Sequence, residues 1–430
     1  MMKKYFVLWF VFTATLLNAQ EVISNLISNP LLLNTKFVSN PNKTVLSLPF
    51  FDDFSYDSTV VNSDLWEQSS VFVNRTYPIN PITIGVATFD GLDEYGLARD
   101  FSPSTSSEPS DTLLSKEIDL SGLTSVYFMF YFQGKGMGEA PELQDKLVLE
   151  FLNDTLGWEQ IWSSNDTISQ EFIKDVEVID ESRFLHNSFQ FRFRNYATIS
   201  GNFDHWHIDY VKMDELLSAA DTSELNDVSF VYSSPSFLKR YSEMPWVHFK
   251  LNMINELKDS IDILLRNNDA STNISYRFKV YENNDSIFSY PLTGNPRHTT
   301  VLDYDIIGNY SFSPLIEVQG NVFNSFQEHS ATFVVKNIID SSGVSSDNNL
   351  NDTLYHIQNF HSHFAYDDGT AESAYGININ GAKLAYEFKL NEADTLIAVQ
   401  MYFPQMLNSV SHIPFKLTIW DNISGSGNII

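Results

Sequence analysis

The stretch Phe189-Gln190-Phe191-Arg192-Phe193-Arg194 has a phenylalanine at every second position and a polar side chain after each one. Successive side chains of a β-strand point to opposite faces, so this spacing predicts a strand with one apolar and one polar face. The same period recurs at 274–280 and 384–390, and turn-rich stretches such as 102–111 and 340–352 separate such runs. We therefore predict an all-β protein built of serial β-sandwiches.

The composition of the chain limits its partners and its means of stabilisation. Its 430 residues carry a formal charge of −28 and no cysteine, and 14% of them are aromatic. Phosphate recognition needs clustered Lys and Arg, so the charge argues against a nucleic-acid partner and against an anionic lipid surface. Without thiols there is no disulfide framework, no Cys-ligated zinc and no cysteine nucleophile. The fold must be stabilised by its apolar core or by ions.

The N-terminus has the order of a secretory signal peptide. Lys3 and Lys4 precede an apolar run at 5–17, and Ala19 is a small residue suited to cleavage after it. The run is shorter than the ~20 residues that span a bilayer, which disfavours the alternative of a permanent membrane anchor. No later segment is long and apolar enough to predict a transmembrane span. We predict that residues 1–19 are removed and that the protein is secreted or displayed on the cell surface.

Changes in composition divide the rest of the chain into segments. We predict an N-terminal linker at 20–44, a first sandwich at 45–213, a linker at 214–225, a second sandwich at 226–357 and a third β domain at 358–430. The third segment holds too few strands to close a sandwich core. We therefore interpret the chain as the front part of a longer protein. The alternative is that the third segment is a small terminal module.

The second predicted sandwich shows alternating runs at 228–232, 247–254, 274–281 and 331–335. This pattern is typical of an immunoglobulin-like or fibronectin-like sandwich. The segment contains no chemical motif, and such modules usually serve as spacers or adhesive surfaces.

The first predicted sandwich opens on Phe50-Phe51-Asp52-Asp53-Phe54-Ser55 and closes on Asp204-His205-Trp206-His207-Ile208-Asp209-Tyr210-Val211. This arrangement resembles the MAM-like jelly rolls of the concanavalin type, which start with an acidic-aromatic strand and end in a strand that contains Ile-Asp. MAM domains carry paired cysteines and this chain has none, so only the architecture carries over. The resemblance implies that the first and last strands lie side by side.

That placement would bring Asp52 or Asp53 near Asp209. Clustered carboxylates repel one another unless a cation or a basic residue intervenes, and hard oxygen ligands suit Ca²⁺. One interpretation is therefore a structural calcium site at Asp52, Asp53 and Asp209. In the alternative, which is the more common behaviour of aspartate, these side chains cap turns and accept hydrogen bonds from backbone N–H groups.

His205, His207 and Asp209 share one face of the last predicted strand. Trp206, Ile208 and Tyr210 share the other, which we expect to face the core. A His-x-His-x-Asp row can ligate zinc, and a bound water would then suit hydrolysis. More often such a row lies on the solvent face of a strand or packs on a loop.

Two further sets of residues could contact a ligand. Asp367, Asp368 and Glu372 lie at an Asp-Asp-Gly-Thr turn and could coordinate a cation, although a spaced calcium-loop pattern is missing. Exposed aromatic rings stack on sugars and on other apolar surfaces, and the candidates are Trp66, Trp158 and Trp162. The alternative for each tryptophan is burial in the core.

Catalytic signatures are missing from the sequence, which has no Gly-x-Ser-x-Gly elbow and no phosphate-binding Gly-rich loop. The signal peptide, the two acidic-aromatic segments of the first sandwich and Tyr366-Asp367-Asp368-Gly369-Thr370-Ala371-Glu372 together are similar to one group of proteins. These are the large secreted or surface proteins of Bacteroidetes that the type IX secretion system exports. The resemblance implies that this export machinery is a partner. Such proteins carry a C-terminal sorting domain, which this chain lacks.

We predict a non-enzymatic, modular, exported protein whose β-sandwiches bind an extracellular glycan or protein, as in adhesion. The alternative is an ancillary region of an exported peptidase or glycosidase whose catalytic domain lies outside this chain. A third hypothesis is hydrolysis by this chain itself through His205, His207 and Asp209.

Overall fold

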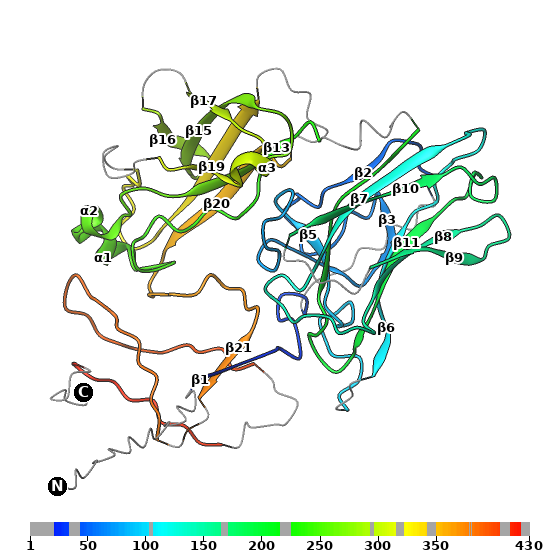
Figure 1. Ribbon diagram of the computed structural model, residues 1–430. Helices are drawn as coiled ribbons and strands as arrows, with labels where there is room; N and C mark the ends of the chain where they lie inside the picture. The colour runs from blue at the N-terminus through cyan, green and yellow to red at the C-terminus, as the bar shows by residue number, and fades with distance from the viewer. Residues whose placement is uncertain are drawn as a thin grey trace, which may run out of the picture.

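The computed structural model describes residues 21–33, 44–102, 106–164, 171–215, 225–292, 296–314, 322–341, 350–377, 379, 381–404 and 413–422. The predicted signal peptide and most of the predicted linker at 214–225 lie outside these residues. Within the described ranges, no helix is long and apolar enough to cross a membrane. Strands dominate the structure, which confirms the prediction of an all-β protein with serial sandwiches (Figure 1).

The first sandwich consists of two antiparallel sheets. One has the order β10-β7-β12-β5-β4, with β2 paired to β12, and the other has the order β3-β6-β11-β8-β9. The strands of the first sheet are β2 (Phe50–Asp52), β4 (Phe72–Asn74), β5 (Val86–Phe89), β7 (Val126–Gly134), β10 (Ile173–Ile179) and β12 (Trp206–Asp214). Those of the second sheet are β3 (Trp66–Ser69), β6 (Ser107–Ser115), β8 (Leu147–Leu152), β9 (Trp158–Ser163) and β11 (Phe191–Thr198). The pairing of β2 with β12 confirms that the first and last strands lie side by side.

An aromatic core fills the space between the two sheets. Phe191 and Phe193 of β11 are fully buried, and the ring centroids of Phe191 and Phe128 lie 4.7 Å apart in an edge-to-face arrangement. Phe193 and Phe130 are 4.9 Å apart in the same geometry. Such aromatic pairs contribute about 0.5–1.5 kcal/mol beyond the burial of their area. Arg192, between the two phenylalanines of β11, points outward, as the alternation predicts.

A bulge in β12 breaks the alternation that we expected there. The register with β7 shifts between Asp209 and Lys212, where Tyr210 adopts a φ of 52°. Trp206 faces the aromatic core, but Tyr210 packs against Phe51 on the opposite face of the sheet. The expectation that Tyr210 shares the core face with Trp206 is therefore wrong, because an extra residue in one strand re-aims the side chains that follow it.

The second sandwich again has two sheets, in the orders β13-β14-β18 and β16-β15-β19-β20, with β17 paired to β15. Its strands are β13 (Val228–Phe230), β14 (Ile263–Asn267), β15 (Thr272–Glu282), β16 (Asp285–Tyr290), β17 (Arg297–Val301), β18 (Tyr310–Phe312), β19 (Ala331–Ser341) and β20 (Thr353–Phe360). Three short helices accompany them: α1 (Trp246–Leu251), α2 (Met253–Glu256) and α3 (Tyr304–Ile307).

The strand predicted at 247–254 is wrong, because α1 and α2 occupy this stretch. Trp246 and Phe249 are fully buried, and a spacing of three residues places both on one face of a helix. Val247 and Leu251 are exposed on the helix. These exposed apolar residues give the sequence an alternating pattern that resembles a strand.

The two sandwiches are packed against each other. Ile84, just before β5, belongs to the core of the second sandwich, and Leu225, just before β13, packs with Tyr210 on the outer face of the β10-β7-β12-β5-β4 sheet. Arg266 of β14 donates a hydrogen bond to the backbone oxygen of Asn80 at 3.0 Å. Around Tyr210, this sheet is therefore covered on both of its faces, by the aromatic core on one side and by the second sandwich on the other.

The segment at 20–44, predicted as a linker, contains a strand. β1 (Glu21–Ser24) pairs antiparallel with β21 (Ala374–Ile377), so the first and the last of the described strands meet in one small sheet (Figure 1). Leu26 and Leu32, which follow β1, are 2% exposed each. Sequence periodicity cannot reveal such a pairing, because the two strands are far apart in the sequence.

The third segment does not form the strand predicted at 384–390. Leu384 and Phe388 are 52% and 51% exposed, and no described segment pairs with this stretch. A strand needs a neighbour to satisfy its backbone N–H and C=O groups, so alternation alone does not produce one. The stretch is attached to the second sandwich through Tyr241, whose hydroxyl accepts from the N–H of Lys389 at 2.7 Å and donates to its oxygen at 3.2 Å.

Replacing Phe128 by alanine should lower the free energy of unfolding of the first sandwich by about 3–5 kcal/mol, because a cavity opens in the centre of the aromatic core. Urea denaturation followed by tryptophan fluorescence measures this change. The matched control is Tyr95→Ala, since Tyr95 is 52% exposed and its removal should change stability by less than about 0.5 kcal/mol. Equal effects of the two substitutions would contradict the placement of Phe128.

Candidate functional site

The carboxylates of Asp52 and Asp53 have hydrogen-bond donors from the protein. Asp52 accepts from the indole N–H of Trp66 at 2.7 Å and from the backbone N–H of Phe54 at 3.0 Å. Asp53 accepts from the backbone N–H and the hydroxyl of Ser55 at 3.2 and 2.5 Å. Both side chains are buried, and burial raises the pKa of Asp52 to about 7. These hydrogen bonds are the ones expected from the alternative to the calcium site, in which the aspartates cap turns and accept from backbone N–H groups.

Asp209 is connected to Asp53 through Thr83. The backbone N–H of Thr83 donates to Asp209 at 2.9 Å, and the threonine hydroxyl lies 3.1 Å from the other Asp209 oxygen and 3.0 Å from the backbone oxygen of Asp53. One hydroxyl proton cannot serve both oxygens, but a proton on Asp209 would satisfy the remaining contact. Burial raises the pKa of Asp209 well above its usual range, in agreement with that proton. A calcium site at Asp52, Asp53 and Asp209 stays a prediction.

The histidines of β12 are buried under the loop that follows β7. The Nε2–H of His207 donates to the backbone oxygen of Lys135 at 3.2 Å, and its Nδ1 accepts from the hydroxyl of Thr88 at 2.8 Å. His205 Nδ1 accepts from the backbone N–H of Glu139 at 3.1 Å. Burial lowers the pKa of His205 to about 3 and that of His207 to about 4, so both rings are neutral at pH 7.

Two glycines allow the loop to lie directly on these rings. A Cβ atom at Gly136, where φ is +56°, would lie 2.5 Å from Nε2 of His207, and one at Gly138 would lie 2.3 Å from Cγ of His205. Side chains cannot approach that closely, so a larger residue would force the loop away from the strand. His205 and His207 therefore pack on a loop, and Asp209 packs on Thr83. Packing on a loop is the alternative that the sequence analysis gave to a zinc site.

Asp367, Asp368 and Glu372 are not brought together as a group of ligands. Asp368 accepts hydrogen bonds from the backbone N–H and the hydroxyl of Thr370 at 3.0 and 2.8 Å, which closes the turn. Asp368 and Glu372 line a cavity of about 310 Å³ together with Arg75 of the first sandwich and residues of the second. The turn accounts for the Asp-Asp-Gly-Thr sequence.

One of the three candidate tryptophans is placed to meet a ligand. Trp66 is 2% exposed in the aromatic core, and Trp162 packs edge-to-face on Phe130 at 5.0 Å. Trp158, at the start of β9, is partly exposed and lies opposite Leu152 of β8. Since Leu152 is on the face of its strand that points away from the core, Trp158 lies on the outside of the sandwich.

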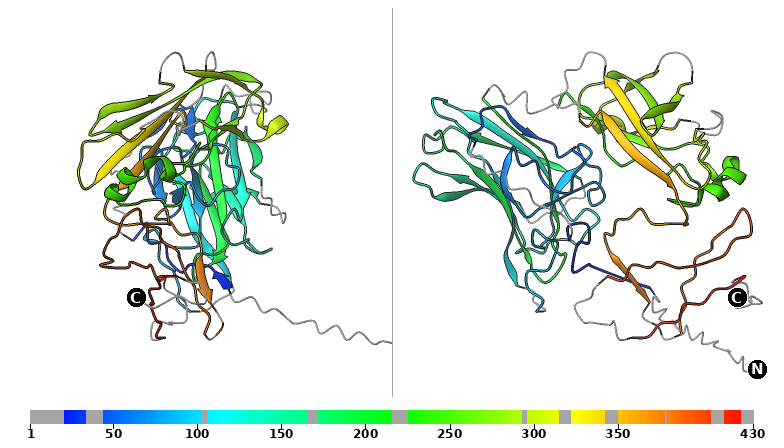
Figure 2. Two further views of the ribbon diagram at one scale, coloured as in Figure 1. Left: turned by 90° about the vertical axis from the view of Figure 1, so that its left-hand side faces the viewer. Right: turned by 180° about the vertical axis from the view of Figure 1, so that it is seen from behind.

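Trp158 belongs to a polar and aromatic surface on the outer face of the β3-β6-β11-β8-β9 sheet. We call this the outer-sheet surface, and its residues are Glu150, Trp158, Arg192, Arg194 and Tyr196. The guanidinium of Arg192 lies 4.2 Å from the ring centroid of Trp158. Glu150 accepts from Arg192 at 2.6 Å and from Arg194 at 3.2 Å, which fixes both arginines on the sheet. Figures 1 and 2 show that this sheet is turned away from the second sandwich.

The sequence analysis missed one group of carboxylates. Among the described residues, this group consists of Glu142, Asp145 and Asp204. The ligand oxygens of these three side chains all lie within 4.8 Å of one another. Two of these residues come from the loop between β7 and β8 and the third from the turn before β12. Because the two loops are far apart in sequence, no spaced motif could have indicated the group.

No protein-family model matches this chain, and no curated protein matches it. Solved structures to which it is similar include the CBM22-1 xylan-binding domain of Xyn10C from Paenibacillus barcinonensis, at 10% identity and a TM-score of 0.25, covering 41% of this chain and 99% of that one. Another is TmCBM61 in complex with β-1,4-galactotriose, at 15% identity and a TM-score of 0.23, covering 34% and 86%. The glycoside hydrolase domain of Endo-D from Streptococcus pneumoniae R6 has 9% identity and a TM-score of 0.25, covering 74% and 44%. Likenesses at these scores assign neither a ligand nor an activity to this chain.

The raised pKa of Asp52 predicts a loss of stability as the pH rises. Between the unfolded value of about 3.9 and the folded value of about 7, the folded chain holds a proton that the unfolded chain releases. The contribution of Asp52 to the free energy of unfolding should therefore fall across this window by up to roughly 4 kcal/mol, and stay flat above it. Asp52→Asn removes this titration, so its melting temperature should depend less on pH between 4 and 8 than that of the wild type.

The control for this measurement is Asp154→Asn, which alters an exposed carboxylate of the same sandwich and should leave the pH dependence unchanged. A different outcome would support a calcium site at Asp52, Asp53 and Asp209. If a cation keeps Asp52 ionised, wild-type stability would hold from pH 5 to 8 and fall on addition of EDTA, and Asp52→Asn would not respond to EDTA.

Proposed function

We propose that this chain is an exported, non-enzymatic binding protein whose first sandwich binds an extracellular glycan on the outer-sheet surface. The observation that carries the proposal is the partly exposed ring of Trp158, fixed on a sheet beside the Glu150–Arg192–Arg194 network. Strands position such groups more firmly than loops do, and a surface held in its binding conformation loses little entropy when a ligand arrives.

The residue types of the outer-sheet surface suit a sugar. One side of a pyranose ring presents C–H groups that pack on an aromatic face, while its hydroxyls both donate and accept hydrogen bonds. Arg192 and Arg194 supply donors, and the hydroxyl of Tyr196 can donate or accept. Glu150 is buried and accepts from both arginines, so it holds them in position. Arg194 already donates to Tyr196 at 3.3 Å, so the polar groups form one connected row along β11 and β8.

Export is the second part of the proposal. It is supported by the order of charge, apolar run and small residue in the first nineteen positions, and by the resemblance to type IX secretion substrates. On the outside of a cell, polysaccharides and glycoproteins are the abundant polymers that such a surface would meet. Recovery of the protein in the culture medium or on the cell surface, with residues 1–19 removed, is the result that this part requires.

Trp158→Ala should weaken glycan binding at least tenfold, a loss of about 1.4 kcal/mol or more, because the stacking ring is removed. The full chain is first screened against soluble and insoluble polysaccharides by affinity electrophoresis and pull-down. The affinity of the variant is then measured for each polysaccharide that binds. Since Trp158 lies outside the core of the sandwich, the variant should keep the melting temperature of the wild type within a few degrees.

The matched control is Tyr355→Ala, which removes a ring that is 53% exposed on β20 of the second sandwich. This variant should bind as tightly as the wild type. Failure of the wild-type chain to bind any polysaccharide would refute the proposal. Binding that Tyr355→Ala abolishes and Trp158→Ala leaves intact would move the site to the second sandwich.

A further inference from the structure

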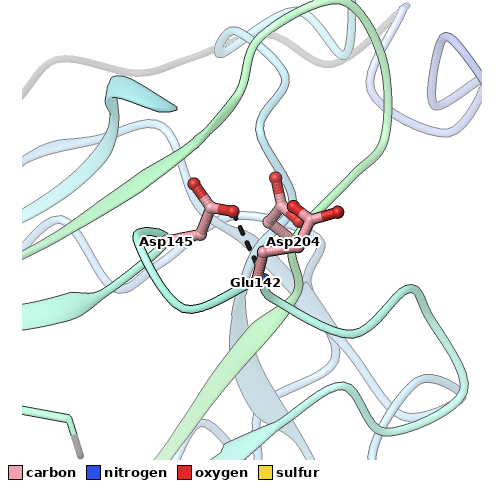
Figure 3. A group of neighbouring side chains, drawn as sticks. All are labelled: Glu142, Asp145 and Asp204. Carbon is pink, nitrogen blue, oxygen red and sulfur yellow. Dashed lines mark hydrogen bonds between the residues drawn. The ribbon is translucent and has the colours of Figure 1, made fainter. Parts of the chain in front are cut away.

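Two loops bring three carboxylates together at one end of the first sandwich. Glu142 and Asp145 come from the loop between β7 and β8, and Asp204 comes from the turn that leads into β12 (Figure 3). Their ligand oxygens all lie within 4.8 Å of one another. Asp145 and Asp204 are each 1% exposed, whereas Glu142 is exposed and opens the group to solvent.

The hydrogen bonds of this cluster leave one buried oxygen without a partner. Asp204 accepts from the backbone N–H of Thr198 at 2.7 Å, and Oδ2 of Asp145 accepts from the backbone N–H of Glu142 at a long 3.3 Å. Oδ1 of Asp145 is buried and has no hydrogen-bond partner among the described residues. A buried polar atom in this state destabilises the fold, so native structures usually supply it with a donor, a water or an ion.

Among the described residues, no basic side chain forms an ion pair with the three carboxylates Glu142, Asp145 and Asp204. Hydrogen bonding with the Asp145 carboxyl, together with partial burial and the neighbouring acids, raises the pKa of Glu142 to about 7. Burial, with the charges of Asp145 and Glu139, raises the pKa of Asp204 to about 6.

We propose that Glu142, Asp145 and Asp204 bind a divalent cation, with Ca²⁺ as the ion that fits this set of oxygen ligands. Calcium accepts six to eight oxygens in a flexible arrangement, including mono- and bidentate carboxylates and water. Two buried carboxylates would hold the ion from the protein side, and the exposed Glu142 leaves room for water ligands and for entry from solvent. Magnesium is less suited, because it requires near-ideal octahedral geometry.

The ion would tie three parts of the chain together. It joins the β7–β8 loop to the turn before β12, and the same turn holds the N-terminal segment, since the N–H of Asn202 donates to the backbone oxygen of Leu26 at 2.9 Å. That segment begins with β1, which pairs with β21. This site differs from the one predicted at Asp52, Asp53 and Asp209 and does not depend on glycan binding.

Terbium luminescence of the full chain tests the proposal, because Tb³⁺ replaces Ca²⁺ at oxygen sites and is excited through a nearby indole. The indole N–H of Trp206 donates to the backbone oxygen of Asp145 at 3.3 Å, so a tryptophan lies beside the cluster. We expect saturable emission with one ion per chain, displacement by Ca²⁺, and a higher melting temperature when Ca²⁺ is added. Glu142→Gln and Asp145→Asn should each weaken Tb³⁺ affinity at least tenfold.

The control is Asp154→Asn, an exposed carboxylate in the same sandwich, which should leave the affinity unchanged. Glu142→Gln changes an exposed residue, so it should fold like the wild type, and circular dichroism verifies this. The proposal is overturned if no saturable emission appears, because the carboxylates then share a proton instead of an ion. It is also overturned if both variants bind as the wild type does, or if Asp209→Asn alone abolishes binding.

Discussion

The burial of β12 on both of its faces is the constraint on which the first sandwich depends. Trp206 faces the aromatic core, while Tyr210 faces the second sandwich. Any polar side chain on such a strand loses its water on both sides and must find its partners within the protein. His207 therefore stays neutral between Lys135 and a threonine, and Asp209 binds both polar groups of one residue. In the sequence, histidine and aspartate at this spacing suggest a metal site. In the structure, these side chains form hydrogen bonds that hold the sandwich together.

The opposite sheet has one buried face and one open face, and the proposed binding surface lies on the open face. The phenylalanines of β11 fill the core, so the residues between them reach solvent with their positions fixed by the strand. Glu150 of the neighbouring strand restrains Arg192 and Arg194, and Arg192 in turn lies on the ring of Trp158. A surface restrained in this way is available for recognition, whereas the outer face of β12 is covered by the loop that follows β7, by Thr83 and, around Tyr210, by the second sandwich.

Sequence periodicity predicted strands correctly where one face of the strand is buried. It failed where contacts with distant segments determine the local structure. The core of β11, the all-β class and the pairing of β2 with β12 were predictable from local pattern or resemblance. The bulge at Tyr210, the helices at 246–256 and the pairing of β1 with β21 were not. Among the candidate tryptophans, the sequence alone could not separate Trp158 from its buried counterparts, because exposure depends on which sheet face the fold leaves open.

The negative charge of the three carboxylates Glu142, Asp145 and Asp204 can be reduced by a proton or by a bound cation. A proton and a cation do not account for the same observations. One shared proton leaves two negative charges on a group with two buried members. It also supplies no ligand to the buried oxygen of Asp145 unless it is placed on that atom. A divalent ion offsets two charges at once and can take up free carboxylate oxygens as ligands. The chain has no cysteine, so no disulfide fixes its loops. Calcium sites of extracellular modules have dissociation constants of roughly 10⁻⁴–10⁻³ M. Weak binding of that order would suffice to fix two loops wherever the ion is present at millimolar concentration.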